Sequence, residues 1–104
     1  MDILLNTDNN ITGSEALSQS VEELVATSLK RFNEQISRVE VHLTDENSHK
    51  PGQNDKRCML EARLEGMKPI AVTEHGDTQI HAVRGAIDKL KSALDTATGR
   101  LKAY

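Results

Sequence analysis

Apolar residues recur at two different periods along this chain, and the period changes from one segment to the next. In the segment 80–101 they fall alternately three and four residues apart, which is the spacing of one face of an α-helix. The segment 11–32 has helical spacing as well. Four other segments predict β-strands, because they alternate apolar and polar residues or carry a short apolar run. These strands are expected at 2–6, 38–44, 57–65 and 69–75.

The first predicted helix carries sequence signals at both of its ends. Thr12 and Ser14 are alternative N-caps, and Glu15 stands three residues after Thr12, as in a capping box. Lys30 and Arg31 stand at the opposite end, where the helix dipole favours positive charge. The sequence therefore predicts one continuous helix that includes both of these basic residues.

The predicted order of elements is strand, helix, strand, strand, strand, helix. A strand–helix–strand unit places its two strands parallel, and the later strands are expected to form an antiparallel meander. Each helix has one apolar stripe and each alternating strand has one apolar face. The sequence thus predicts an α+β fold, a β-α-β-β-β-α two-layer sandwich in which both helices pack on one face of a four-stranded mixed sheet. A chain of 104 residues has the size of a single domain, expected at 1–104.

The alternation also assigns residues to the two faces of the sheet. In the third strand we expect the helix-facing residues to be Cys58, Leu60, Ala62 and Leu64. Met59 falls on the opposite face and is apolar among polar neighbours. The second and third strands are separated by a long polar loop at 45–56, which contains a Pro-Gly pair.

Charge and composition limit the classes of molecule that we expect this protein to bind. The net charge is −3, whereas a generic nucleic-acid-binding domain is expected to be basic. The basic excess is confined to 75–104, with five Lys and Arg against three Asp and Glu. Aromatic residues make up only 2%, so any nucleic acid would be bound through phosphates and shape rather than by base stacking. No apolar run has bilayer-spanning length and one cysteine permits no intrachain disulfide, so we expect a cytoplasmic protein without a membrane partner.

Few residues of the sequence are candidates for metal binding or catalysis. The four histidines are His42, His49, His75 and His81. None of them has a metal-ligand spacing with another histidine, a cysteine or a carboxylate. The single cysteine is predicted on the buried face of a strand, and the chain has no glycine-rich phosphate loop. The sequence therefore predicts no metal, no cofactor and no enzymatic activity.

The last predicted helix carries a row of basic residues beside its apolar stripe. At about 100° per residue, Arg84, Lys91 and Lys102 fall in one narrow sector. Asp88 and Asp95 lie beside them, four residues after Arg84 and Lys91 respectively. One interpretation is a surface for nucleic acid, and the other is a solvated face with weak ion pairs. The charge pattern alone favours the second interpretation.

Three stretches of the chain are similar to one protein family. They are "NTDNNITGSEAL", "RVEVHL" and "AVRGAIDKLKSAL". With the order of elements, they resemble the ribosome hibernation promoting factor family, also called ribosome-associated inhibitor or sigma-54 modulation proteins. The resemblance spans nearly the whole chain, and in the last helix Asp88, Lys89 and Leu90 match the family pattern.

The resemblance implies a fold similar to double-stranded-RNA-binding domains and a function at the ribosome. Family members bind the small ribosomal subunit in the channel for messenger and transfer RNA and block translation when growth stops. Basic residues of their two helices contact ribosomal RNA. Carried over to this short-form chain, the expected contact residues are Lys30, Arg31, Arg84, Lys89, Lys91, Arg100 and Lys102.

The chain also departs from the family pattern. Thr96 and Thr98 stand where lysines are usual, Ser18 replaces a basic residue of the first helix, and Ile80 replaces a tyrosine. Each missing phosphate contact weakens RNA binding, so we expect lower affinity than in a lysine-rich relative. The alternative hypothesis is a non-enzymatic protein-interaction or dimerisation module, with a homodimer formed through the open sheet edge or the exposed sheet face.

Overall fold

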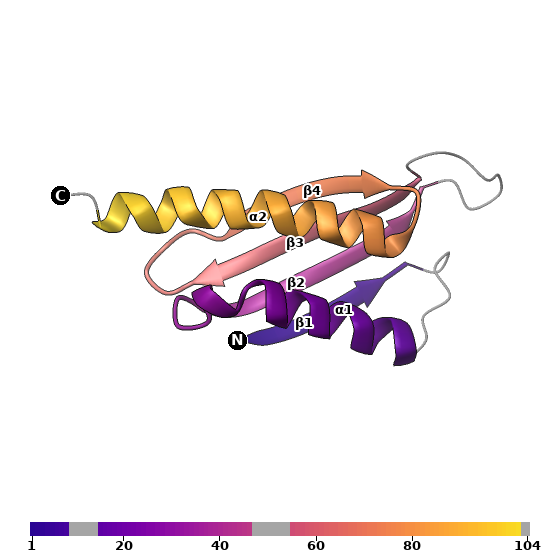
Figure 1. Ribbon diagram of the computed structural model, residues 1–104, viewed down its shortest axis with the longest axis horizontal. Helices are drawn as coiled ribbons and strands as arrows, with labels where there is room; N and C mark the ends of the chain where they lie inside the picture. Colours follow the sequence, from indigo (N-terminus) through magenta and orange to yellow (C-terminus); the bar gives the residue numbers. More distant parts are fainter. Residues whose placement is uncertain (9–14, 47–54, 103–104) are drawn as a thin grey trace.

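The computed structural model describes residues 1–8, 15–46 and 55–102, and it has the predicted order of elements (Figure 1). Both helices lie on the same face of a four-stranded sheet, which confirms the predicted two-layer α+β architecture. The elements are β1 (Asp2–Thr7), α1 (Glu15–Ser28), the 3₁₀ helix η1 (Lys30–Phe32), β2 (Ile36–Asp45), β3 (Lys56–Leu64), β4 (Ile70–Gly76) and α2 (Gln79–Lys102).

The sheet has the strand order β1-β2-β3-β4. β1 pairs with β2 in parallel, and the other two pairs are antiparallel, as the connections predict. One row across the sheet consists of Leu5, Val41, Leu60 and Val72. This row faces the helices and is buried at its two central positions, because successive side chains of a strand point to opposite faces.

The core lies between this face and the apolar stripes of the helices. α2 packs mainly over β3 and β4, whereas α1 lies over β1. Leu90 and Leu94 of α2 are fully buried, as are Cys58 and Leu60 of β3. Met59 lies on the other face and is half-buried. The predicted assignment of β3 residues to the two faces is therefore confirmed.

The end of the first helix differs from the prediction. α1 ends at Ser28, and Lys30 and Arg31 lie in the separate 3₁₀ turn η1. Hydrogen bonds that span three residues, such as Phe32 N–H to the Leu29 carbonyl at 2.9 Å, satisfy carbonyls that the end of an α-helix leaves without partners. The tighter winding leads the chain directly into β2. The predicted N-caps Thr12 and Ser14 lie outside the described residues, as does most of the loop after Asp45.

A β-bulge at Ser37 extends β2 beyond the predicted strand. The register shifts between Ile36 and Arg38, so Ser37 has no cross-strand partner of its own. Its hydroxyl donates a hydrogen bond to the Arg63 carbonyl at 3.1 Å. Ile36 and Val39 consequently both face the core although they are three residues apart. This spacing explains why the alternation in the sequence begins only after the bulge.

Leu90 tests the packing of α2 on the sheet. Its side chain is fully buried, so Leu90→Ala should lower the free energy of unfolding by about 2–5 kcal/mol through lost burial and a residual cavity. Ser92→Ala, at an exposed position of the same helix, should change it by less than about 0.5 kcal/mol. Urea titration of both variants measures the difference, and similar small effects would contradict the position of α2.

The two glycines inside α2 have opposite surroundings. A Cβ at Gly85 would stand 2.5 Å from Cγ of Glu74, whereas a Cβ at Gly99 would meet nothing within 4 Å. Glu74 cannot simply move away, because its carboxylate accepts a hydrogen bond from the His75 backbone N–H at 2.9 Å. Gly85 therefore permits the close approach of α2 to β4.

Gly99→Ala should stabilise the protein by up to about 1 kcal/mol, the usual preference for alanine in a helix. Gly85→Ala should lower the free energy of unfolding despite the same preference, because the new methyl group displaces Glu74. Thermal and urea unfolding of the two variants make the comparison. A gain in stability at Gly85 equal to that at Gly99 would show that α2 lies farther from β4.

Candidate nucleic-acid interface

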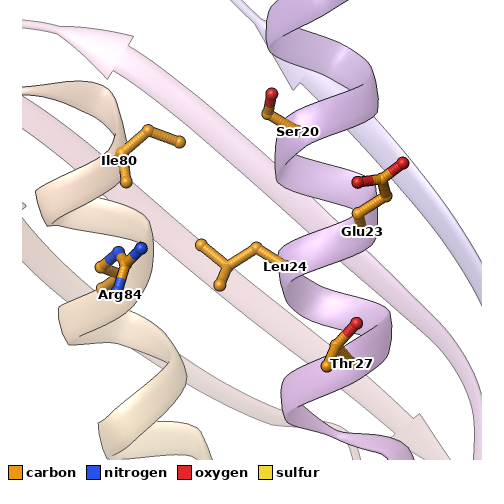
Figure 2. A pocket seen from close by; sticks show the side chains of 6 residues that line it. All are labelled: Ser20, Glu23, Leu24, Thr27, Ile80 and Arg84. Atoms are coloured by element: carbon orange, nitrogen blue, oxygen red, sulfur yellow. The ribbon is translucent and has the colours of Figure 1, made fainter.

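A groove runs between the two helices on the surface of the helical layer (Figure 2). Its larger part has a volume of about 480 Å³ and is lined by Ser20, Glu23, Leu24, Thr27, Ile80 and Arg84. A smaller hollow of about 200 Å³ is lined by Leu24, Ser28, Arg84, Ile87, Asp88 and Lys91. Leu24 and Arg84 line both parts, so we treat the two as one interhelical groove.

The groove follows from how the helices pack. The two helices lie over different strands of the sheet, and contact between α1 and α2 is slight compared with the contact of α2 with β3 and β4. Figure 2 shows Leu24 pointing from α1 towards α2, with Ile80 and Arg84 on the facing side of α2. Leu24 and Ile80 are half-buried and supply apolar surface within the groove. The polar residues stand around this surface.

The charges of the groove are mixed. Arg84 is exposed, Lys91 is half-buried, and neither makes an ion pair within the described part of the chain. Glu23 and Asp88 line the same groove, so carboxylates stand among the cations. The structure thus brings together two of the predicted contact residues and places acids beside them.

Arg31 forms a two-pronged ion pair with Asp95 of α2. The nitrogen–oxygen distances are 2.7 Å and 2.8 Å, and the guanidinium also lies 4.3 Å from the centroid of the Phe32 ring. The hydrogen bond from Arg31 lowers the pKa of Asp95, and the charge of Lys91 lowers it further. The predicted Lys91–Asp95 pairing is therefore replaced by a pairing with a residue 64 positions away. Both side chains are more than half exposed, so solvent weakens the attraction.

Lys89 lies on the other side of α2 from the groove. Its position is about 140° around the helix from Arg84, which turns it towards β4. The ammonium donates a hydrogen bond to the Thr73 carbonyl at 2.9 Å and lies 3.3 Å from a Glu74 carboxylate oxygen. The pKa of Glu74 is lowered, first by the hydrogen bond from the His75 N–H and then by Lys89. Lys89 thus holds α2 against the edge strand β4.

The remaining predicted contact residues lie at the ends of elements. Lys30 is exposed in η1 and has no ion pair among the residues that the structure describes. Arg100 and Lys102 belong to the end of α2, where only the backbone is described.

Sequence reasoning missed the polar lining that α1 contributes. Ser20, Thr27 and Ser28 line the groove with hydroxyl groups, and none of them was singled out. Together with Leu24 they recur at spacings of three, four and seven residues, which places them on one side of the helix. This regular row of small polar residues was the available signal, although it cannot show which element it faces.

The other residues considered for catalysis or metal binding are the cysteine and the histidines. Burial raises the pKa of the Cys58 thiol to about 12, so it stays protonated at neutral pH and is a poor nucleophile. His75 Nε2 lies 2.5 Å from a Glu46 carboxylate oxygen. Across 1–8, 15–46 and 55–102, no three metal-ligating side chains gather in one place; His49 falls outside these ranges. None of the described helices is both long and apolar enough to cross a bilayer.

The fold is that of a small α+β domain with a groove between its two helices. The family model described as "Sigma 54 modulation protein / S30EA ribosomal protein" matches residues 6–102. The chain therefore belongs to this family, as the sequence resemblance predicted.

Solved structures of other proteins share this fold, among them the following two. The chain is similar to the N-terminal domain of Thermus thermophilus Protein Y, with 20% identity, a TM-score of 0.73 and coverage of 92% of this chain and 98% of that chain. It is also similar to a ribosomal subunit interface protein from Coxiella burnetii, with 20% identity, a TM-score of 0.70 and coverage of 95% and 99% respectively. A comparison with curated proteins found no match.

The lowered pKa of Glu74 predicts a pH-dependent contribution to stability. A carboxyl whose pKa is lower in the folded state than its ordinary value of 4.5 stabilises the fold above that value. The contribution disappears as the pH falls through the folded-state pKa. Glu74→Gln should therefore destabilise the protein at pH 7 and have a smaller effect at pH 3, as measured by urea titration.

Glu65→Gln is the matched control, because Glu65 is an exposed glutamate outside the strands. It should change the free energy of unfolding little at either pH. A Glu74→Gln effect that is the same at pH 7 and pH 3 would show that the contact with Lys89 and the His75 N–H does not stabilise the ionised carboxylate.

Proposed function

We propose that this protein binds the small ribosomal subunit through contacts between its helical layer and phosphates of ribosomal RNA, and that it inhibits translation by occupying the subunit. Membership of the S30EA family supports a ribosomal partner. The similar protein from Coxiella burnetii is a ribosomal subunit interface protein, which supports the same partner. The proposed function is binding, and no catalytic step is part of it.

The observation that carries the proposal is the arrangement of Arg84 and Lys91. They stand two helical turns apart on the groove side of α2, about 10 Å along the axis. Neither makes an ion pair within the described part of the chain, so both remain available to phosphate oxygens. Phosphate groups would meet the hydroxyls of α1 across the same groove.

The other predicted cations contribute in different ways. Lys30, Arg100 and Lys102 are proposed to extend the phosphate-binding surface beyond the groove. Arg31 must first exchange the Asp95 carboxylate for a phosphate, which costs little because exposed ion pairs contribute only about 0–1 kcal/mol. Lys89 would have to leave both the Glu74 carboxylate and the Thr73 carbonyl, so we expect it to contribute least.

The small number of available cations determines the strength of binding. Each neutralised phosphate adds about 0.9 to the slope of log affinity against log salt concentration in duplex DNA. Three contacts would then reduce affinity about 40-fold between 50 and 200 mM salt. Glu23 and Asp88 reduce it further by repelling the phosphates.

Arg84→Glu tests the contact in the groove. Co-sedimentation with purified small ribosomal subunits over a salt series should show binding about tenfold weaker than wild type at moderate salt, with a salt slope reduced by about one. The matched control is Lys68→Glu, which makes the same change of charge at an exposed position between β3 and β4. It should retain wild-type binding to within about twofold.

Two results would contradict the proposal. Equal losses in both variants would show that only net charge matters and that the groove makes no specific contact. No binding by the wild-type protein at 50 mM salt would exclude the small subunit as partner. That result would favour the alternative function, a protein-interaction or dimerisation module on the same fold.

A further inference from the structure

The two edges of the sheet differ in how they are protected. The edge of β4 is protected near its middle, because Lys89 donates to the Thr73 carbonyl and the charged Glu74 points to the helix side, opposite Cys58. Both devices discourage the addition of another strand. β1 is the other edge strand and pairs only with β2 among the described residues. Within the described part of the chain, no strand pairs with the outer edge of β1.

β1 carries few of the features that protect an edge. Its sequence, "DILLNT", has no lysine, no proline and no bulge, and Asp2 is its one charged residue. Leu4 points to the face away from the helices and is 44% exposed. Among the residues whose burial the structure describes, it is the one large apolar side chain that is exposed. The strand therefore offers both backbone hydrogen bonds and an apolar contact.

The segment that contains β1 is acidic, although Arg38 of β2 stands beside Asp2. Residues 1–29 contain five Asp and Glu and no Lys or Arg, which leaves 13 basic and 11 acidic residues for 30–104. This acidic segment includes both β1 and α1, which lies over β1 in Figure 1. Asp2, Glu15 and Glu22 are all exposed. RNA phosphates are repelled by this region, and a basic polypeptide is attracted to it.

We propose that the free edge of β1 is a strand-addition site for an extended, lysine- or arginine-rich segment of a partner protein. The backbone of the segment would continue the sheet, which is an established mode of peptide recognition. Side chains of the segment on the outer face would contact Leu4, and its basic residues would meet the acids of β1 and α1. A second copy of this chain fits less well, because it would bring the same acidic segment against the first.

This site is separate from the phosphate contacts proposed for the groove. Its test uses the purified protein without ribosomes, so the two proposals succeed or fail independently. The probe is a labelled eight-residue peptide of alternating Lys and Val. Two comparison peptides replace every Lys by Glu, or carry N-methyl groups on alternate amides so that they cannot extend a sheet.

The protein variants localise the site. Leu4→Lys adds a charge at the β1 edge, and Ala71→Lys adds the same charge on the same face of the opposite edge strand, where Ala71 is exposed. In fluorescence titrations the Lys/Val peptide should bind the wild type, and Leu4→Lys should weaken it at least tenfold. Ala71→Lys should change it by less than twofold. In NMR spectra of the ¹⁵N-labelled protein, the peptide should shift the amides of β1.

Several results would overturn the proposal. One is that the N-methylated peptide or the Glu peptide binds as tightly as the Lys/Val peptide. Another is that Leu4→Lys and Ala71→Lys weaken binding of the Lys/Val peptide equally. A third is that the peptide shifts mainly the amides of β4 or of the interhelical groove. Sedimentation of the free protein tests the competing occupant. A wild-type dimer that Leu4→Lys converts to a monomer would assign the edge to a second copy and overturn the peptide assignment.

Discussion

Every element of this protein is held in place by the burial of one face of its sheet. Strands alternate with a period of two, so Val41 and Leu60 point to one side while their neighbours point away. Two helices supply the apolar cover, and each covers about half of that face. The opposite face is polar and stays exposed. On it, Glu40 forms ion pairs with Arg38 of the same strand and with Arg63 of the neighbouring strand β3. The interhelical groove lies along the line where the two helices meet, so the candidate site is a direct result of how the helices pack on the sheet.

The sequence was informative wherever burial repeats at a regular period. The element order, the faces of β3 and the burial of Leu90 all followed from apolar spacing, and the structure agrees with them. Local spacing could not predict the bulge at Ser37 or the 3₁₀ turn after α1. Both depend on how the chain enters the next strand, which is determined by packing rather than by periodicity.

The candidate site was less predictable than the fold, because a charge in the sequence does not reveal its partner. The cation Arg31 is engaged by Asp95, which is 64 positions away, and Lys89 is engaged by the edge of β4. Arg84 and Lys91 follow the same sequence rules but face the groove. The angular position of each basic residue around α2 determines which neighbouring element it faces. That position distinguishes the cations that hold the fold together from those that are available to bind a phosphate.

The uneven distribution of charge along the chain becomes a gradient across the sheet. Residues 1–29 carry a net charge of −5, 30–74 are balanced at eight acidic and eight basic residues, and 75–104 carry +2. β1 lies at one edge, and α2 lies over the other. The molecule is therefore an electric dipole directed across its strands. The field of a nearby polyanion therefore exerts a torque that turns α2 towards the polyanion before any contact forms. The orientation of the molecule is selected during diffusion. Its rate of association consequently depends on salt concentration even though its net charge is negative.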